Sequence, residues 1–164
     1  MRAAAVLAGL ALVAGLVVLL LLITREAEES QGAGAEPEQP QAVREVIGEA
    51  APGLPFSPAV RVGDTLYVSG QMAINPETGT EVRESIEAET ERVMLNIERL
   101  VRMAGFEMSD VTRATVFLSD IDDYGAMNAV YSRFFPADPP ARACVAVDSL
   151  VRGFRLEISC IAQR

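Results

Sequence analysis

Apolar residues recur three or four positions apart through residues 86–104, and polar residues fill the positions between them. This period predicts an amphipathic helix, and Gly105 is well suited to follow its last turn. A second run with the same period covers residues 124–134, and Pro136 ends it. The pattern therefore predicts one long helix and one shorter helix in the second half of the chain.

Other segments have the alternating, β-branched character of strands. Residues 60–62 and 65–69 flank the pair Gly63-Asp64, which supplies a turn, so they predict a β-hairpin. Residues 111–118 alternate in the same way and predict a strand between the two helices.

Two more strands are expected near the C-terminus, at residues 141–147 and 154–162. The link between them is short, so they are expected to pair as antiparallel neighbours. The order of elements is then β-β-α-β-α-β-β, which predicts an α+β domain with a mixed sheet and two helices on one face. The other sheet face needs a different cover, and self-association is the simplest one.

The same pairing makes a prediction about the two cysteines. If the turn centres near residues 150–152, Cys144 lies across from Ser159 and Cys160 points to the opposite sheet face. A disulfide needs Cα atoms within about 7 Å and side chains that face each other. We therefore expect no disulfide between them.

The N-terminus differs in composition from the rest of the chain. Residues 3–23 carry no charge, and about 20 such residues can span the ~30 Å core of a bilayer as a helix. We interpret residues 1–24 as a transmembrane anchor, residues 25–46 as a flexible acidic Pro/Gly linker, and residues 47–164 as the globular domain. A single-pass membrane protein with an extracytoplasmic domain is the resulting expectation. A cleaved signal peptide is the alternative.

Composition narrows the chemistry. The sequence has no His, Lys or Trp, and all 14 of its basic residues are Arg. Imidazole bases, lysine Schiff bases and histidine metal sites are therefore excluded. The net charge of −9 argues against nucleic acid as the main partner.

A fixed guanidinium remains the best tool for binding a small molecule. Arg142 follows Pro139 and Pro140 and opens an apolar strand, so its position is more constrained than that of other arginines. Guanidinium binds a carboxylate through two parallel hydrogen bonds, which Lys cannot reproduce. Cys144 lies two residues later, but the sequence has no His or Lys to lower the pKa of its thiol, so we expect a core residue and not a nucleophile.

Several segments together resemble the RidA/YjgF enamine/imine deaminase family, and their order and spacing match it over about residues 50–162. They are Pro55-Phe56-Ser57-Pro58, the stretch from Arg61 to Gln71, Pro76-Glu77-Thr78-Gly79, Asn96-Ile97, Thr115-Val116-Phe117-Leu118, Asn128-Ala129-Val130-Tyr131, Pro140-Ala141-Arg142, Glu157-Ile158 and Ile161-Ala162.

This resemblance implies a chorismate-mutase-like fold, a homotrimer, and ligand clefts between adjacent subunits. It implies hydrolysis of 2-imino or 2-enamino acids to 2-keto acids and ammonia, with no cofactor and no metal. By the same resemblance Arg142 anchors the substrate carboxylate, and the backbone at Cys144 helps to hold a water molecule. Ser69, Gly70 and Asn128 match positions that line the pocket.

Two positions depart from the family pattern. Phe56 stands where members often have Tyr, and Ser159 stands where they carry an acid that is thought to activate the water. Glu157 shares the strand face of Ser159, so it is a candidate to replace that acid.

Three hypotheses remain open at this point. The first is a membrane-anchored deaminase acting on small imino acids, with Arg142 and Cys144 as its catalytic residues and Phe56, Ser69, Gly70, Asn128 and Ser159 as further substrate-binding residues. The second is a non-catalytic module that binds a small imino or keto acid, which the loss of the acid at Ser159 favours. The third is a scaffold in which trimerisation clusters membrane anchors.

Overall fold

The computed structural model describes residues 42–49 and 53–164. The expected anchor, residues 1–24, and most of the expected linker lie outside these residues. Within the described ranges, no helix combines the length and the apolar character that crossing a bilayer requires.

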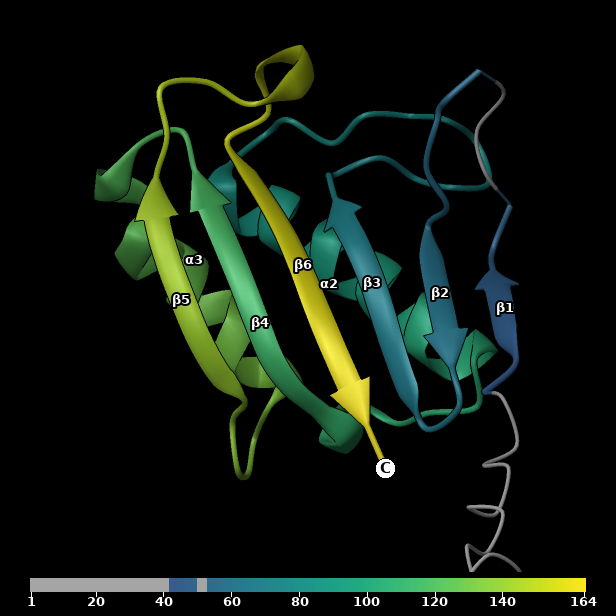
Figure 1. The fold of residues 1–164 in the computed structure, drawn as a ribbon. Helices are drawn as coiled ribbons and strands as arrows, with labels where there is room; N and C mark the ends of the chain where they lie inside the picture. Colours follow the sequence, from purple (N-terminus) through teal and green to yellow (C-terminus); the bar gives the residue numbers. More distant parts are fainter. Residues whose placement is uncertain (1–41, 50–52) are drawn as a thin grey trace, which may run out of the picture. The chain divides into compact units, whose positions relative to one another are not determined.

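A single six-stranded sheet organises the described part of the chain, with the strand order β1-β2-β3-β6-β4-β5 (Figure 1). The strands are β1 (Arg44–Ile47), β2 (Ala59–Val62), β3 (Thr65–Gln71), β4 (Val111–Leu118), β5 (Ala141–Ala146) and β6 (Leu156–Gln163). Strands β4 and β5 run parallel, and the other neighbouring strands run antiparallel. The sheet is thus mixed, as predicted.

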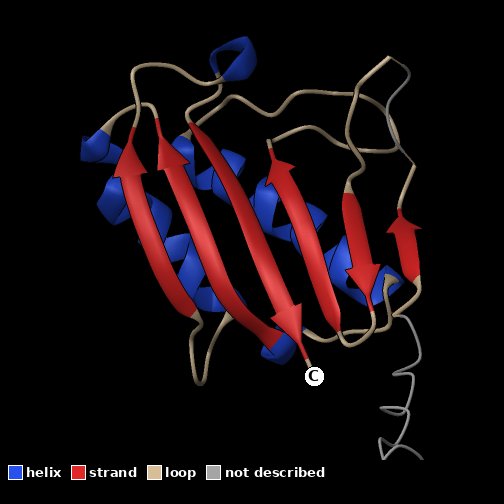
Figure 2. Ribbon diagram, viewed as in Figure 1, coloured by secondary structure: helices blue, strands red, loops and turns tan. Residues whose placement is uncertain are grey.

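Two helices, α2 (Ile86–Met103) and α3 (Tyr124–Tyr131), lie on one face of this sheet (Figure 2). The side chain of Ser85 accepts a hydrogen bond from the backbone N–H of Ala88 and so caps the start of α2. Gly105, with φ of 79°, follows the end of α2 in the left-handed region that glycine tolerates best. Short 3₁₀ turns, η1 to η4, occupy Met108–Asp110, Ile121–Asp123, Ser132–Phe134 and Val151–Gly153.

The hydrophobic core lies between the helices and the sheet. The periodic apolar residues of α2 are buried in it, among them Val93, Ile97 and Val101. They pack against alternate residues of the central strands, such as Leu66 and Ile158. Burial of these side chains is the main term that holds helix and sheet together.

The predicted elements largely match the structure, but strand β1 was missed. It begins at Arg44, within the last residues expected to belong to the linker, and pairs with β2. Three of its four side chains are exposed, so no alternating pattern marks it. An edge strand of this kind is specified mainly by its pairing partner.

The predicted hairpin of the last two strands is wrong. Strand β4 lies between β5 and β6, so that Cys144 pairs with Val116 and Cys160 pairs with Ala114. Both cysteines therefore face the helices, and the expectation that Cys160 points the other way fails. Both thiols are free because a whole strand separates them.

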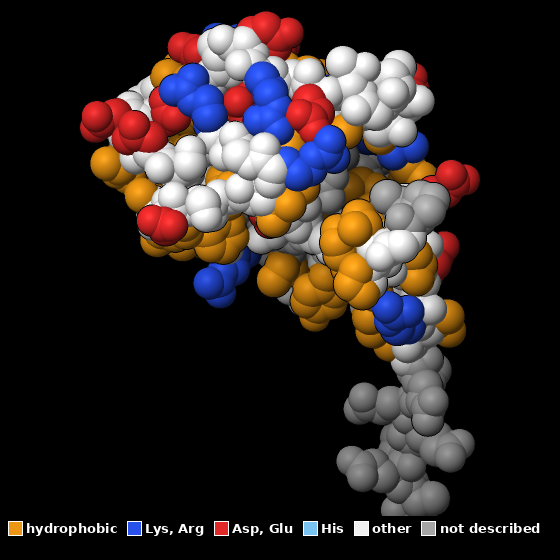
Figure 3. Space-filling view, turned by 90° about the horizontal axis from the view of Figure 1, so that it is seen from above, with side chains coloured by type: hydrophobic (Ala, Val, Ile, Leu, Met, Phe, Trp, Pro, Cys, Tyr) orange, Lys and Arg blue, Asp and Glu red, His pale blue; other side chains and the backbone are white. Residues whose placement is uncertain are grey.

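Charged side chains gather at the end of the domain where β6 begins, which Figure 3 views from above. Arg83 donates hydrogen bonds to the carbonyls of Arg152 and Gly153 and lies 4.1 Å over the ring of Phe154. Arg155 binds both carboxylate oxygens of Asp123, at 2.5 and 3.0 Å. These contacts fix the link that carries the chain from β5 across to β6.

Candidate functional site

The guanidinium of Arg142 lies against helix α3, on the helix-covered side of edge strand β5. It sits 4.6 Å from the ring centroid of Tyr131 and 5.7 Å from that of Tyr124. Its Nη2 donates a hydrogen bond to the Tyr124 hydroxyl at 3.4 Å, and its Nη1 lies 4.0 Å from the Met127 sulfur. The side chain is half-buried, so part of it stays accessible to a ligand.

Strand alternation explains why Arg142 points this way. Its partner in the parallel pairing is Ala114, which is buried in the core, so the side chain at position 142 is directed towards the helices. Only α3 covers this edge of the sheet (Figure 1). The guanidinium therefore meets the aromatic side chains of α3.

No carboxylate of the described residues pairs with this guanidinium. The ion pairs formed among residues 42–49 and 53–164 involve Arg83, Arg102, Arg152 and Arg155, and none involves Arg142. A half-buried cation without an acidic partner is suited to bind an anion from outside the chain.

Asn128 and Cys144 lie in the same region. Asn128 shares a face of α3 with Tyr124 and Tyr131, because residues four and seven positions apart are on the same side of a helix. Cys144 is two residues from Arg142 on the same face of β5 and packs against the core. Burial raises the pKa of the Cys144 thiol, with a smaller opposing effect from Arg142, so the thiol is neutral near pH 7. A nucleophilic thiolate at this position is therefore not supported.

The other predicted site residues lie elsewhere on the domain. Ser69 and Gly70 are at the end of β3, and the Ser69 hydroxyl donates to the carbonyl of Ser57 at 2.8 Å. Phe56, in the preceding loop, is 50% exposed. Ser159 is on β6, and its side chain points to the sheet face without helices.

Glu157 shares that open face with Ser159 and has an unusual relation to Gly70. A Cβ at position 70 would lie 1.8 Å from the Oε1 atom of Glu157, so the missing side chain leaves the space that the carboxylate occupies. Burial raises the pKa of Glu157 above its usual value. The carboxylate therefore holds a proton more readily than an exposed one.

The predicted residues thus form two groups within one chain. Arg142, Cys144 and Asn128 lie on the helix side of β5, whereas Gly70 and Ser159 lie by β3 and β6, with β4 between the groups. They do not share one cleft within a single chain. A hollow of about 250 Å³ on the open face includes Ser159, Tyr67 and Thr115, but not Arg142.

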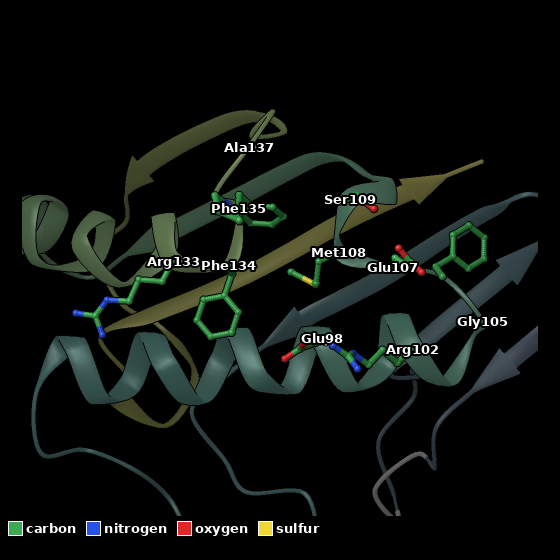
Figure 4. A pocket seen from close by; sticks show the side chains of 12 residues that line it. Glu98, Arg102, Gly105, Glu107, Met108, Ser109, Arg133, Phe134, Phe135 and Ala137 are labelled. Atoms are coloured by element: carbon green, nitrogen blue, oxygen red, sulfur yellow. Dashed lines mark hydrogen bonds and ion pairs between the residues drawn. The ribbon is translucent and has the colours of Figure 1, made fainter.

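A second hollow, of about 990 Å³, is also separate from Arg142 (Figure 4). It lies between the C-terminal half of α2 and the segments that carry Met108 and Phe134. Arg102 and Glu98 on its wall already pair with each other at 2.7 Å. This hollow has no part in the predicted chemistry.

The sequence did not predict the position of two tyrosines. Tyr124 and Tyr131 lie in the helix predicted at residues 124–134, and the structure shows that they are direct neighbours of the Arg142 guanidinium. The helical period could show that they share a face, but not that β5 would lie against that face. No cluster of three or more Cys, Asp or Glu residues suited to a metal ion occurs in the described ranges.

This chain is similar to several known proteins. Residues 47–164 match the family model Ribonuc_L-PSP, described as Endoribonuclease L-PSP. A RutC family protein of Saccharolobus solfataricus is 44% identical over 110 residues, which cover 67% of this chain and 87% of that protein. The 2-iminobutanoate/2-iminopropanoate deaminase of Capra hircus is 40% identical over 123 residues, covering 73% and 90%.

Solved structures give the same result. The crystal structure of the YjgF gene product of E. coli has a TM-score of 0.69 and 35% identity, and covers 73% of this chain and 98% of that one. A structure from Thermotoga maritima has a TM-score of 0.70 and 40% identity, and covers 73% and 97%.

These findings correct the expected localisation. The match covers 87% of the Saccharolobus solfataricus protein and 97% of the Thermotoga maritima chain. None of the described helices is long and apolar enough to cross a membrane. The expectation of a single-pass membrane protein with an extracytoplasmic domain is therefore wrong. The fold, the family match over residues 47–164 and the identities of 40% and more agree, and the chain belongs to the RidA/YjgF family.

Proposed function

We propose that this protein is a deaminase that hydrolyses small 2-imino or 2-enamino acids to 2-keto acids and ammonia. The names of its relatives support this reaction class, since they include the goat 2-iminobutanoate/2-iminopropanoate deaminase and a Reactive Intermediate Deaminase A of Arabidopsis thaliana. The observation that carries the proposal is the Arg142 guanidinium, which is half-buried against α3 and has no carboxylate partner among the described residues.

Arg142 would bind the substrate carboxylate through two parallel hydrogen bonds. Each such charge-assisted bond contributes on the order of 1.5–3 kcal/mol. Anchoring the carboxylate also fixes the adjacent C=N carbon, so that a bound water can attack it. A protonated imine is already electrophilic, so a well-positioned water can attack it without a strong base.

The reaction is balanced without a cofactor. Water adds to the imine carbon, the resulting carbinolamine loses its nitrogen as ammonia, and the carbon becomes the ketone. The backbone at Cys144 would help to hold the water, in keeping with the neutral state of its thiol.

We further propose a homotrimer, in which one chain's Arg142 group would meet the group around Gly70 and Ser159 of its neighbour. Support comes from the separation of the two groups within one chain and from the sheet face that α2 and α3 leave uncovered. Exposed Tyr67 and Val145 on that face would be buried in such an assembly.

The direct test is ammonia release from imines generated from small amino acids, measured on the full-length protein. Arg142→Ala should reduce the rate to the uncatalysed level. Arg133→Ala is the matched control, because Arg133 is exposed and donates only to the carbonyl of Ala129. Wild-type protein with no more release than Arg142→Ala would refute the catalytic proposal.

A second candidate function is a binding module for a small carboxylate without turnover. The presence of Ser159 in place of an acid favours it, because a hydroxyl cannot accept the proton of a water effectively near pH 7. In that case the wild type would bind a 2-keto acid without releasing ammonia, and Ser159→Glu would restore release.

The family description also names an endoribonuclease. The composition of this chain gives that activity little support, because it has a net charge of −9 and no Lys or His. A small anionic molecule at Arg142 fits the described contacts better than a polynucleotide.

A further inference from the structure

The tyrosines of α3 hold Arg142 in a way that the deaminase reaction itself does not require. Guanidinium has two faces and an edge, and only the edge carries N–H donors. The aromatic rings of Tyr124 and Tyr131 lie within 5.7 Å of the guanidinium carbon, where cation–π attraction acts. Aromatic contacts with the guanidinium leave its remaining N–H groups for a ligand.

The hydroxyl of Tyr124 adds a directional contact. It accepts the hydrogen bond of Arg142 Nη2 at 3.4 Å, and a phenol that accepts can still donate its own proton. No hydrogen bond from this hydroxyl to another described residue is formed. Tyr124 is 43% exposed, so the hydroxyl can reach a bound molecule.

Tyr131 plays a different part. It is 6% exposed, and its hydroxyl is buried without a hydrogen-bond partner in the described residues. Burial raises the pKa of Tyr131 to about 12, so the ring stays neutral and acts on Arg142 through its π face. Of the two tyrosines, only Tyr124 therefore accepts a hydrogen bond from Arg142.

We propose that Tyr124 is a positioning residue for Arg142 and a further donor to the ligand: its hydroxyl orients the guanidinium and donates its own proton to the carboxylate that Arg142 binds. This inference rests on the proposed function in that Arg142 binds a carboxylate. It adds a specificity for small acids whose carboxylate can contact the guanidinium edge and the phenol together.

The first experiment measures binding of pyruvate, a small 2-keto acid, to the full-length protein by calorimetry. Tyr124→Phe keeps the ring and removes the hydroxyl, and should weaken binding about tenfold. Tyr124→Leu also removes the ring and should weaken it about threefold more. Ser132→Ala is the control, since it removes a hydroxyl that donates to Ala129 in the same segment and should bind like the wild type.

A second measurement separates positioning from function, because it needs no ligand. The order parameter of the Arg142 side-chain Nε–H, measured by NMR in the free protein, should exceed that of exposed Arg133 and fall in Tyr124→Phe. In turnover, Tyr124→Phe should raise KM more than it lowers kcat, because the lost contacts are made with the bound carboxylate already in the ground state.

The outcomes distinguish the two claims. If Arg142→Ala abolishes pyruvate binding while Tyr124→Phe binds like the wild type, the role of Tyr124 is refuted and the proposed anchor stands. If the wild type does not bind pyruvate, the proposed anchor fails, and the NMR result still decides whether Tyr124 orders the guanidinium. Equal order parameters in the wild type and Tyr124→Phe would refute the positioning role.

Discussion

The carboxylate of Glu157 occupies the space that a side chain at Gly70 would need. A Cβ at position 70 would lie 1.8 Å from Oε1 of Glu157 and 2.6 Å from its carboxyl carbon. Two non-bonded atoms cannot come so close. Glu157 can therefore adopt this conformation only because position 70, on the neighbouring strand, has no side chain.

Gly70→Ala should therefore displace Glu157 and lower the free energy of unfolding by about 1 kcal/mol. The cost stays moderate because the atom in the way is the end of a flexible side chain. Urea denaturation is the measurement, and the double variant Gly70→Ala/Glu157→Ala should recover most of the loss.

Gly125→Ala is the matched control. Gly125 lies in α3 with nothing within 4 Å of a Cβ placed on it, so alanine should raise the free energy of unfolding by about 0.5 kcal/mol. Equal effects of the two substitutions would show that the contact with Glu157 does not determine the outcome.

Arg142→Lys should not preserve the function of Arg142. Lysine keeps the charge but cannot form two parallel hydrogen bonds, so pyruvate binding should fall at least about tenfold. Retention of wild-type binding in Arg142→Lys would mean that charge alone, and not the fork geometry, holds the ligand.

Much of the fold could be predicted from local pattern. The hairpin of β2 and β3, strand β4 and helix α2 each carry a strong period or a turn signal, and the structure confirms them. The placement of β5 could not be predicted in the same way. A short link suggests a hairpin, whereas this link carries the chain from β5 past β4, so that β6 pairs on the far side of β4. Hydrogen bonds from Arg83, far away in the sequence, stabilise that link.

The same limit applies to the candidate site. The sequence around Arg142 predicts a fixed guanidinium, but its tyrosine neighbours become visible only when α3 and β5 are packed together. The wrong strand pairing also reversed the expected direction of Cys160, since a change of neighbour changes which residues face each other.

The pair of Asp123 and Arg155 should contribute measurably to stability. Asp123 is 8% exposed and accepts two hydrogen bonds from the guanidinium, so Asp123→Ala should cost about 2 kcal/mol. The control is Glu98→Ala, which breaks the exposed pair with Arg102 and should cost less than about 0.5 kcal/mol. Similar losses of unfolding free energy in the two variants would contradict this ranking.

Glu89 should make stability depend on pH in an unusual direction. It is 1% exposed, and burial raises its pKa above 4.5, although the backbone N–H of Arg155 donates to it. The folded state then binds a proton more tightly than the unfolded state. The contribution of Glu89 is therefore fully present below pH 4.5 and is lost as the pH rises through its raised pKa.

Glu89→Gln should reduce the loss of unfolding free energy that occurs as the pH rises above 4.5. Any such loss that remains in this variant would come from Glu157, whose pKa is also raised. Glu87 is the control in the same helix, because hydrogen bonds from its own backbone and from Ser85 lower its pKa. Glu87→Gln should remove a contribution of the opposite sign, which is present above pH 4.5 and lost as the pH falls through the lowered pKa. An unchanged profile in Glu89→Gln would mean that the buried carboxylate does not titrate in this range.

The uncovered sheet face offers the test of the proposed trimer. Val145 is 46% exposed on β5, and Ala141 and Ala143 beside it are exposed on the same face. If this face is buried between copies of the chain, Val145→Glu places a carboxylate in an apolar interface, where burying an unpaired charge is costly. The molar mass in solution, measured by light scattering after size-exclusion chromatography, should fall from that of a trimer to that of a monomer. Met103→Glu, at a 51% exposed position near the end of α2, should leave the mass unchanged. A wild-type monomer would refute the trimer outright, and a Val145→Glu trimer would place the interface on another surface.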